Sequence, residues 1–126
     1  MSQLYRLVLF FVFTLMAVNV NASYILLLGD DFSETFIAPY LIDEGHEVIS
    51  ESTYYDWNGD IPSETEVIIY LDGYEYDYAL GEFGDDVAAN AAILNFVANG
   101  GGLIFTEWSA YSEKKEKVAD LMPVSY

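Results

Sequence analysis

Acidic side chains follow two apolar runs of the sequence, at the positions where the runs end. Asp30 and Asp31 follow the run 24–28, and Asp72 follows the run 67–71. Hard divalent cations such as Ca²⁺ and Mg²⁺ prefer several carboxylate oxygens. The three aspartates therefore make a candidate cation site, although the sequence contains no EF-hand loop of the D-x-D-x-D-G type.

A different chemistry is open to Glu107 and Trp108, which follow a third apolar run at 103–106. Glu107 paired with Asp72 could carry out acid–base catalysis on a sugar if their carboxyl groups lie about 5 to 9 Å apart. Trp108 and the tyrosines that begin at Tyr74 could stack on sugar rings. Such tyrosines are equally typical of protein interaction surfaces, so a glycan and a protein are both candidate ligands.

All of these residues are expected at one rim of a sheet. Open α/β sheets bind ligands beyond the carboxyl ends of their strands, near the point where the strand order reverses. The predicted ligand-binding residues are Asp30, Asp31, Asp72, Gly73, Tyr74, Glu107 and Trp108. A structural interpretation stays open, in which Asp31 caps a helix, Gly73 makes a turn and Trp108 covers the sheet edge.

Nucleophilic catalysis has little support in the sequence. The chain has no cysteine, which excludes disulfides, cysteine-based zinc or iron–sulfur sites and a thiol nucleophile. The single histidine, His46, is predicted at the amino end of the second strand, across the sheet from Ser109. A Ser–His pair is therefore not expected.

The charge balance is strongly acidic. The 126 residues include 4 Lys+Arg against 21 Asp+Glu, which gives a net charge of -17. Nucleic-acid binding depends on Lys and Arg contacts to phosphates, so a nucleic-acid partner is not expected. The acidic groups are interpreted as a solvated surface or as ligands of external cations.

Residues 1–22 have the pattern of a secretory signal. One cation, Arg6, precedes the apolar run 7–18, and small residues flank the predicted cleavage after Ala22. A twelve-residue helix spans only about 18 Å, well below the roughly 30 Å of a bilayer core. The sequence predicts a secreted or periplasmic protein whose mature chain begins at Ser23 and has no transmembrane span.

Strands and helices are predicted in the order β-α-β-β-α-β-α. The predictions are strands at 24–28, 47–53, 67–71 and 103–106, a helix ending by Gly45, a helix between Asp86 and Gly100, and a helix at 112–122. Strands this apolar, alternating with helices, predict a three-layer α/β domain with a mostly parallel sheet of about four strands, as in flavodoxin-like folds. Such sheets usually carry more strands, so the chain is expected to be truncated and its exposed edge adhesive.

Local signals refine these helices. Asp31 and Glu34 have the spacing of a capping box, and Pro39 predicts a late start or a kink. Asp85 or Asp86 is predicted to cap the second helix. The apolar stripe of that helix is predicted at Val87, Ala91, Leu94 and Ala98, with Ile93, Phe96 and Val97 beside it.

Four segments together resemble the class I glutamine amidotransferase-like superfamily, in particular its ThuA-like secreted branch. They are Ile25–Asp31, Gly45–Val48, Val67–Gly73 and Leu94–Ile104, where Phe96-Val97 precedes Gly100-Gly101-Gly102. The resemblance covers most of residues 24–111. It implies a flavodoxin-like domain over residues 23–126.

The resemblance also bears on activity. Catalytic members carry a Cys nucleophile after the fourth strand, where this chain has Trp108, and an indole cannot attack a carbonyl. Gly73 matches the position whose backbone N–H helps to form their oxyanion hole. Amidotransferase activity is thus excluded, while a ThuA-like carbohydrate-active enzyme using Asp72 and Glu107 stays an alternative.

Receiver-type phosphorylation domains offer a further comparison. Asp30, Asp31 and Asp72, with Thr106, fit their acidic pattern, which would bind Mg²⁺ and phosphorylate Asp72. An exported protein meets no phosphodonor, so cation binding without phosphotransfer is the better form of this idea. The preferred prediction is a secreted, non-catalytic domain that recognises a glycan or a protein.

Overall fold

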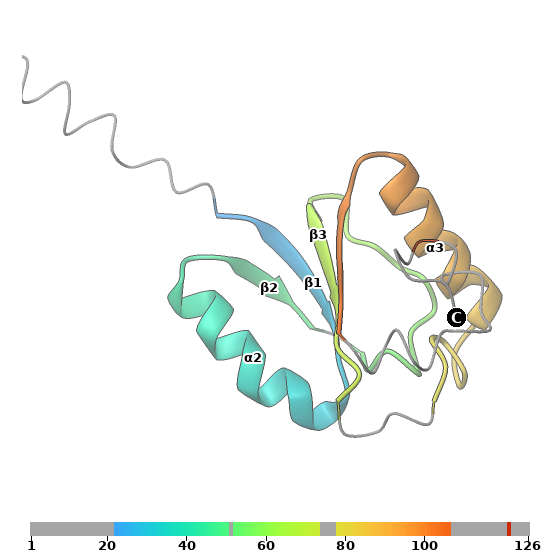
Figure 1. Ribbon diagram of the computed structural model, residues 1–126, viewed down its shortest axis with the longest axis horizontal. Coiled ribbons are helices and arrows are strands. Elements are labelled where there is room, and N and C mark those ends of the chain that lie inside the picture. Colours follow the sequence, from blue (N-terminus) through green and yellow to red (C-terminus); the bar gives the residue numbers. More distant parts are fainter. Residues whose placement is uncertain (1–21, 51, 74–77, 107–120, 122–126) are drawn as a thin grey trace, which may run out of the picture.

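The domain is built on a four-stranded, all-parallel sheet. A computed structural model describes residues 22–50, 52–73, 78–106 and 121. The strands β1 (Tyr24–Leu28), β2 (Glu47–Ile49), β3 (Val67–Tyr70) and β4 (Gly102–Phe105) lie in the order β2-β1-β3-β4 (Figure 1). Together with α2 (Asp31–Asp43) and α3 (Asp86–Ala98) they confirm the predicted α/β class.

The two helices lie on opposite faces of this sheet (Figure 1). Side chains alternate along β1, so that Ile25 and Leu27 join the small apolar cluster beneath α2. Leu26 and Leu28 belong to the larger cluster on the α3 face. Burial on both faces explains why β1 has no polar residue after Tyr24.

Helix α2 begins one residue earlier than the capping-box spacing predicts. Asp30, not Asp31, is the N-cap, and its side chain accepts a hydrogen bond from the Ser33 N–H. The predicted late start is also wrong, because the helix runs through Pro39 from Asp31. An exposed position on the outer side of the helix accommodates the proline ring.

Both helices end in the same way. The Gly45 and His46 N–H groups turn back to the carbonyls of Ile42 and Leu41, which is a Schellman motif. The residues after α3 repeat this pattern, with Gly100 N–H bonded to Val97 and Gly101 N–H to Phe96. Both glycine stops predicted from the sequence are confirmed.

The predicted apolar stripe of α3 is wrong, although its predicted cap at Asp85 is confirmed. The helix buries Ala89, Asn90 and Ile93, whereas Val87 is 64% exposed. Apolar residues occur all around this helix, so the spacing does not specify one face. The face is chosen by contact with the sheet instead.

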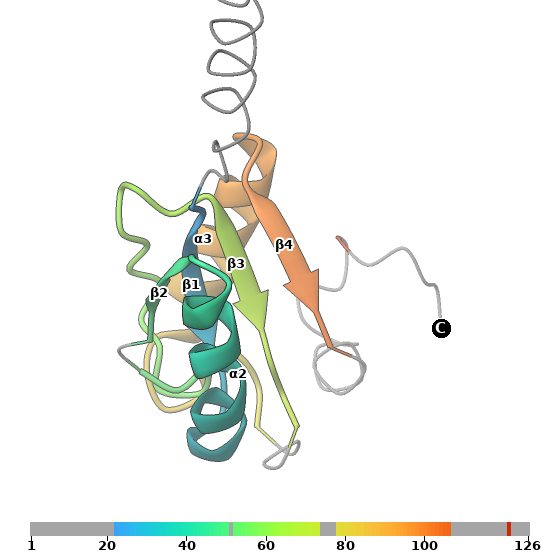
Figure 2. The ribbon, with the colours of Figure 1, turned by 90° about the vertical axis from the view of Figure 1, so that its left-hand side faces the viewer.

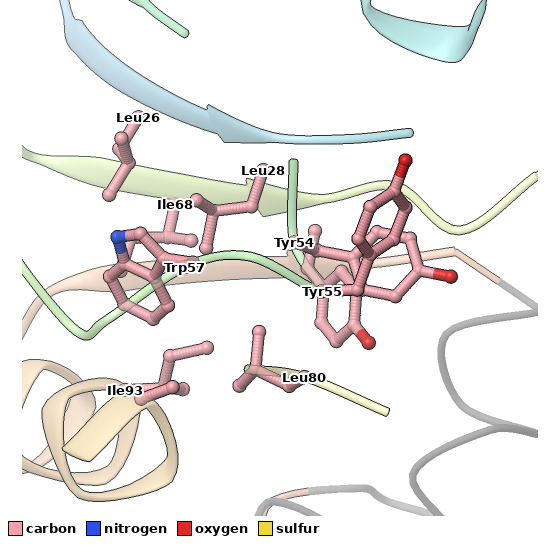
Figure 3. Close-up of a cluster of buried hydrophobic side chains, with 10 residues drawn as sticks. Leu26, Leu28, Tyr54, Tyr55, Trp57, Ile68, Leu80 and Ile93 are labelled. Carbon is pink, nitrogen blue, oxygen red and sulfur yellow. The ribbon is translucent and has the colours of Figure 1, made fainter. Parts of the chain in front are cut away.

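The connection from β2 to β3 is part of the core. The predicted second strand at 47–53 stops at Ile49, because the chain then crosses to the α3 face, where the Tyr54 N–H bonds to the Gly29 carbonyl. Tyr54, Tyr55 and Trp57 are buried there against the α3-face cluster (Figure 3). The connection from β2 to β3, which contains no helix in its described residues, therefore covers β1 on the α3 face.

The remaining sequence predictions fall largely outside the described residues. Of the helix predicted at 112–122, only Leu121 is described, and it packs against the α3-face cluster. The connection between β3 and α3 is described from residue 78 onward, where Leu80 is fully buried. No helix within the described ranges is both long enough and apolar enough to cross a bilayer.

Candidate functional site

The strand order reverses between β1 and β3, the place where open α/β sheets bind ligands. The residues leaving these strands, Asp30 and Asp72, are 0% and 1% exposed. The carboxyl ends of β1 and β3 are joined by the Leu71 N–H, which donates to the Leu28 carbonyl at 2.8 Å. The structure therefore brings these two predicted residues to the switch point.

Asp30 ties two chain segments together. One carboxylate oxygen accepts the Ser33 N–H at 2.6 Å, and the other accepts the Gly73 N–H at 3.2 Å. The same side chain thus caps α2 and holds the residue that follows β3. This is a structural role for a residue that the sequence placed among the ligand-binding and cation-binding groups.

Gly73 is engaged in the same tie. Its N–H, which the family resemblance places in an oxyanion hole, donates to a carboxylate oxygen of Asp30. A developing oxyanion at this N–H would be repelled by that carboxylate. The backbone also runs so close to α2 that a Cβ on Gly73 would lie 2.7 Å from the Ser33 Oγ.

Thr106 forms the corresponding link to β4. Its hydroxyl donates to the Asp72 carbonyl at 3.1 Å and accepts the Asp72 N–H at 3.2 Å. The carboxyl ends of β1, β3 and β4 are therefore bound to one another through side chains.

A crevice of about 300 Å³ lies at this rim, between α2 and the ends of β3 and β4. We call it the switch-point crevice; its lining residues are Phe32, Ser33, Phe36, Ile37, Leu71, Asp72, Gly73 and Thr106. The Phe32 and Phe36 rings, 56% and 53% exposed, contact each other with centroids 4.8 Å apart. The sequence prediction missed these phenylalanines, although their i, i+4 spacing at the start of α2 was visible.

Two other pockets lie on the α3 side of the sheet. One of about 190 Å³ lies beside Trp57 and the backs of Leu26 and Leu28, and another of about 390 Å³ lies between Pro62 and Phe96. Neither includes a residue predicted at the carboxyl-end rim. Position at the strand-order reversal therefore favours the switch-point crevice as the candidate site.

The other predicted site residues do not join it in the described structure. Asp31 is exposed on the first turn of α2 and does not line the crevice. Tyr74, Glu107 and Trp108 lie outside the described residues, so the Asp72–Glu107 pair has no described geometry. Among the described residues, no three histidine or acidic side chains form a group that could hold a metal ion.

Comparisons with protein-family models, with curated proteins and with solved structures found no match.

Glu34, on the first turn of α2, is a half-buried carboxyl that does not line the crevice. Burial raises its pKa above the ordinary value of 4.5, and the neighbouring Asp31 and Asp30 charges raise it further. A side-chain bond with Ser50 and the Gly29 N–H, which donates to its Oε1 at 3.0 Å, lower it in part. Glu34 therefore takes up a proton more readily in the folded chain than in the unfolded chain.

We expect Glu34→Gln to change how stability depends on pH. Between 4.5 and the higher folded pKa, the native carboxyl keeps a proton that the unfolded one has released, so the free energy of unfolding falls as pH rises. Glutamine removes this titration while its amide oxygen can still accept the Gly29 N–H. The variant should therefore gain stability relative to the wild type as pH rises through this window, and the difference should be constant above it.

Urea denaturation at several pH values from about 4 to 8 measures this difference. Glu82→Gln is the matched control, because Glu82 is exposed and also accepts a backbone N–H, that of Ala79. This control shows how much of the change in the pH dependence of stability comes simply from removing one of the many negative charges. Parallel curves for the two variants would contradict the assignment to Glu34.

Proposed function

We propose that this protein is a secreted, non-catalytic recognition domain of the glutamine amidotransferase-like fold, and that its ligand binds in the switch-point crevice. The observation that carries the proposal is the hydrogen bond from the Gly73 N–H to the Asp30 carboxylate, at a crevice lined by the rings of Phe32 and Phe36. The group that relatives of the proposed family use for oxyanion binding is engaged by a carboxylate. The neighbouring surface offers contact area instead of a nucleophile.

The chemistry of the crevice favours a ligand with an apolar face and no negative charge. Exposed Phe32 and Phe36 supply flat apolar surface, and the Ser33 hydroxyl supplies a hydrogen-bonding group at its edge. Acidic groups at Asp30 and Asp72 disfavour anions. Neutral oligosaccharides combine C–H faces with hydroxyl groups and are the ligand class that fits these properties best.

Binding of the purified protein to a panel of neutral, sialylated and sulfated oligosaccharides tests this proposal. We expect binding of neutral members, and a loss of about tenfold in affinity for Phe36→Ala, equivalent to about 1.4 kcal/mol. Phe83→Ala is the matched control, because Phe83 is the same residue type, is 59% exposed and packs against Tyr55 and Tyr78 away from the crevice. Calcium is added in one series to detect a cation requirement.

The outcomes separate cleanly. Neutral glycans that bind the Phe83 variant but not the Phe36 variant support the proposal. Binding that is equal in both variants, a preference for sulfated glycans, or no binding by the wild type would overturn it. Thermal unfolding followed by circular dichroism confirms that each variant is folded.

A further inference from the structure

On the sheet face that carries α2, this helix mainly contacts the β1 and β2 half of the sheet. On the opposite face, α3 contacts β4 and shares an apolar cluster with β3, and Trp57 belongs to the same cluster as Leu26 and Leu28 of β1. On the near face, α2 contacts β1 and β2. Within residues 22–50, 52–73, 78–106 and 121, no helix lies over β4 on this face, and Figure 2 shows β4 standing clear beside α2.

Strand register places an apolar side chain in this open area. Ile104 of β4 pairs with Ile69 of β3, so both point to the α2 face. Ile69 is 8% exposed beneath α2, whereas Ile104 is 52% exposed. The apolar surface of the sheet therefore continues beyond the edge that α2 protects.

Helix α2 borders the same area with an apolar flank. Ser33, Ile37 and Tyr40 follow each other at i, i+4 and i+7, and Ser33 and Ile37 face the ends of β3 and β4. Ile37 is 38% exposed and Tyr40 is 70% exposed. We call the area bounded by Ile37, Tyr40, Ile69 and Ile104 the open quadrant.

The spacing of strands leaves room for one more helix beside α2. Two strand spacings, each about 4.8 Å, separate the β1–β2 pair that α2 contacts from the β3–β4 pair, and a helix with its side chains is about 10 Å across. The same layer already holds α2, and helices packed in one layer lie about 8 to 10 Å apart. A helix placed here would contact Ile104 below and Ile37 beside it.

Charge identifies the kind of helix that fits. Between Ser23 and Glu113 the chain has no lysine or arginine, and Glu44 continues the flank of Ile37 and Tyr40 by one further turn. A second copy of the chain would bring its own charge of -17 to this surface. Lysine or arginine side chains on an incoming helix would instead be attracted by the exposed Glu44 carboxylate and by the negative charge of the domain.

The geometry points to the open quadrant as a docking surface for a cationic amphipathic helix of a partner protein. Its apolar stripe covers Ile104 and Ile37, and its basic residues lie toward the exposed Glu44. This goes beyond the proposed glycan site: the switch-point crevice lies at the carboxyl ends of the strands, whereas the open quadrant lies along the sheet face. Ile37 is common to both, so the test uses Ile104.

Synthetic peptides supply the probe. One helix of about 18 residues carries leucine at i, i+3, i+4 and i+7 and lysine elsewhere; a second has the same composition in permuted order; a third has glutamate in place of lysine. Fluorescence anisotropy at about 0.15 M salt measures their affinity for the purified protein. We expect the first peptide to bind at least about tenfold more tightly than the other two.

Ile104→Ser should weaken that binding about tenfold and leave glycan binding unchanged. Val87→Ser is the matched control, because Val87 is 64% exposed on α3 at the opposite face. Equal affinity for the permuted peptide, equal affinity for the glutamate peptide, or no effect of Ile104→Ser would overturn the inference. A dimer in sedimentation that Ile104→Ser dissociates would overturn it as well, because a second copy would then occupy the surface.

Discussion

Trp57→Ala is expected to remove about 3 to 5 kcal/mol from the free energy of unfolding, a large part of what a small domain has. Trp57 is 4% exposed and packs with Leu26, Leu28 and Ile93 in the α3-face cluster. Its indole N–H donates to the Asp60 carbonyl at 3.1 Å, which closes the turn around it. Alanine would leave a cavity between the β2–β3 connection, the sheet and α3. Urea denaturation followed by far-ultraviolet circular dichroism measures the loss.

Two companion variants separate burial from side-chain size. Phe36→Ala removes an aromatic ring that is 53% exposed, and it should cost less than about 1 kcal/mol. Trp57→Phe keeps part of the packing but loses the bond to Asp60, so its effect should be intermediate. A Trp57→Ala variant as stable as Phe36→Ala would show that the connection is not part of the core.

Asp30→Ala is expected to cost about 2 to 4 kcal/mol. Loss of an N-cap removes about 0.5 to 2 kcal/mol, and leaving a further N–H at the rim without its acceptor adds about 1 to 3 kcal/mol. The variant loses both bonds at once, the one from Ser33 and the one from Gly73. Because Gly73 belongs to the crevice, ligand binding should weaken together with stability.

Asp85→Ala is the control that separates the effect of losing the Gly73 bond from the effect of losing a helix N-cap. Asp85 caps α3 through a single bond from the Ala88 N–H, at an exposed position. Its removal should cost about 1 kcal/mol. Asp30→Asn should fall between the two, because the amide can accept from Ser33 but presents a donor to Gly73. Equal losses for Asp30→Ala and Asp85→Ala would contradict the structural role of the second oxygen.

Much of the architecture could be predicted because it depends on local patterns. β1 and β3 are continuous apolar runs, which are typical of strands in a sheet buried on both faces. Gly45 and Gly100 predict helix ends because a helix end commonly needs a residue at positive φ, and these glycines have φ of +92° and +94°. The cap of α2 was misplaced by one residue, since Asp30 and Asp31 both offer a carboxylate and only the path of the chain leaving β1 decides between them.

The site was predicted less completely, because its properties depend on contacts between distant segments. The sequence places Asp30, Asp72 and Gly73 at the rim, and the structure agrees. It does not reveal that Asp30 is committed to Gly73, 43 residues away, instead of to a ligand. Nor does it reveal that Phe32 and Phe36 remain exposed, because exposure depends on which part of the sheet α2 covers.

The connection between β2 and β3 affects where the chain can be altered. Surface loops usually accept foreign sequence, but this one is pinned by Tyr54 N–H to Gly29, by Gly81 N–H to Tyr54 and by Phe83 N–H to Tyr55. An epitope tag or a fluorescent label inserted there would separate the aromatic rings from the strands they cover. The exposed turn at Glu44 is the better place for an insertion, provided that Gly45 is kept, because its φ of +92° is a conformation that other residues rarely adopt.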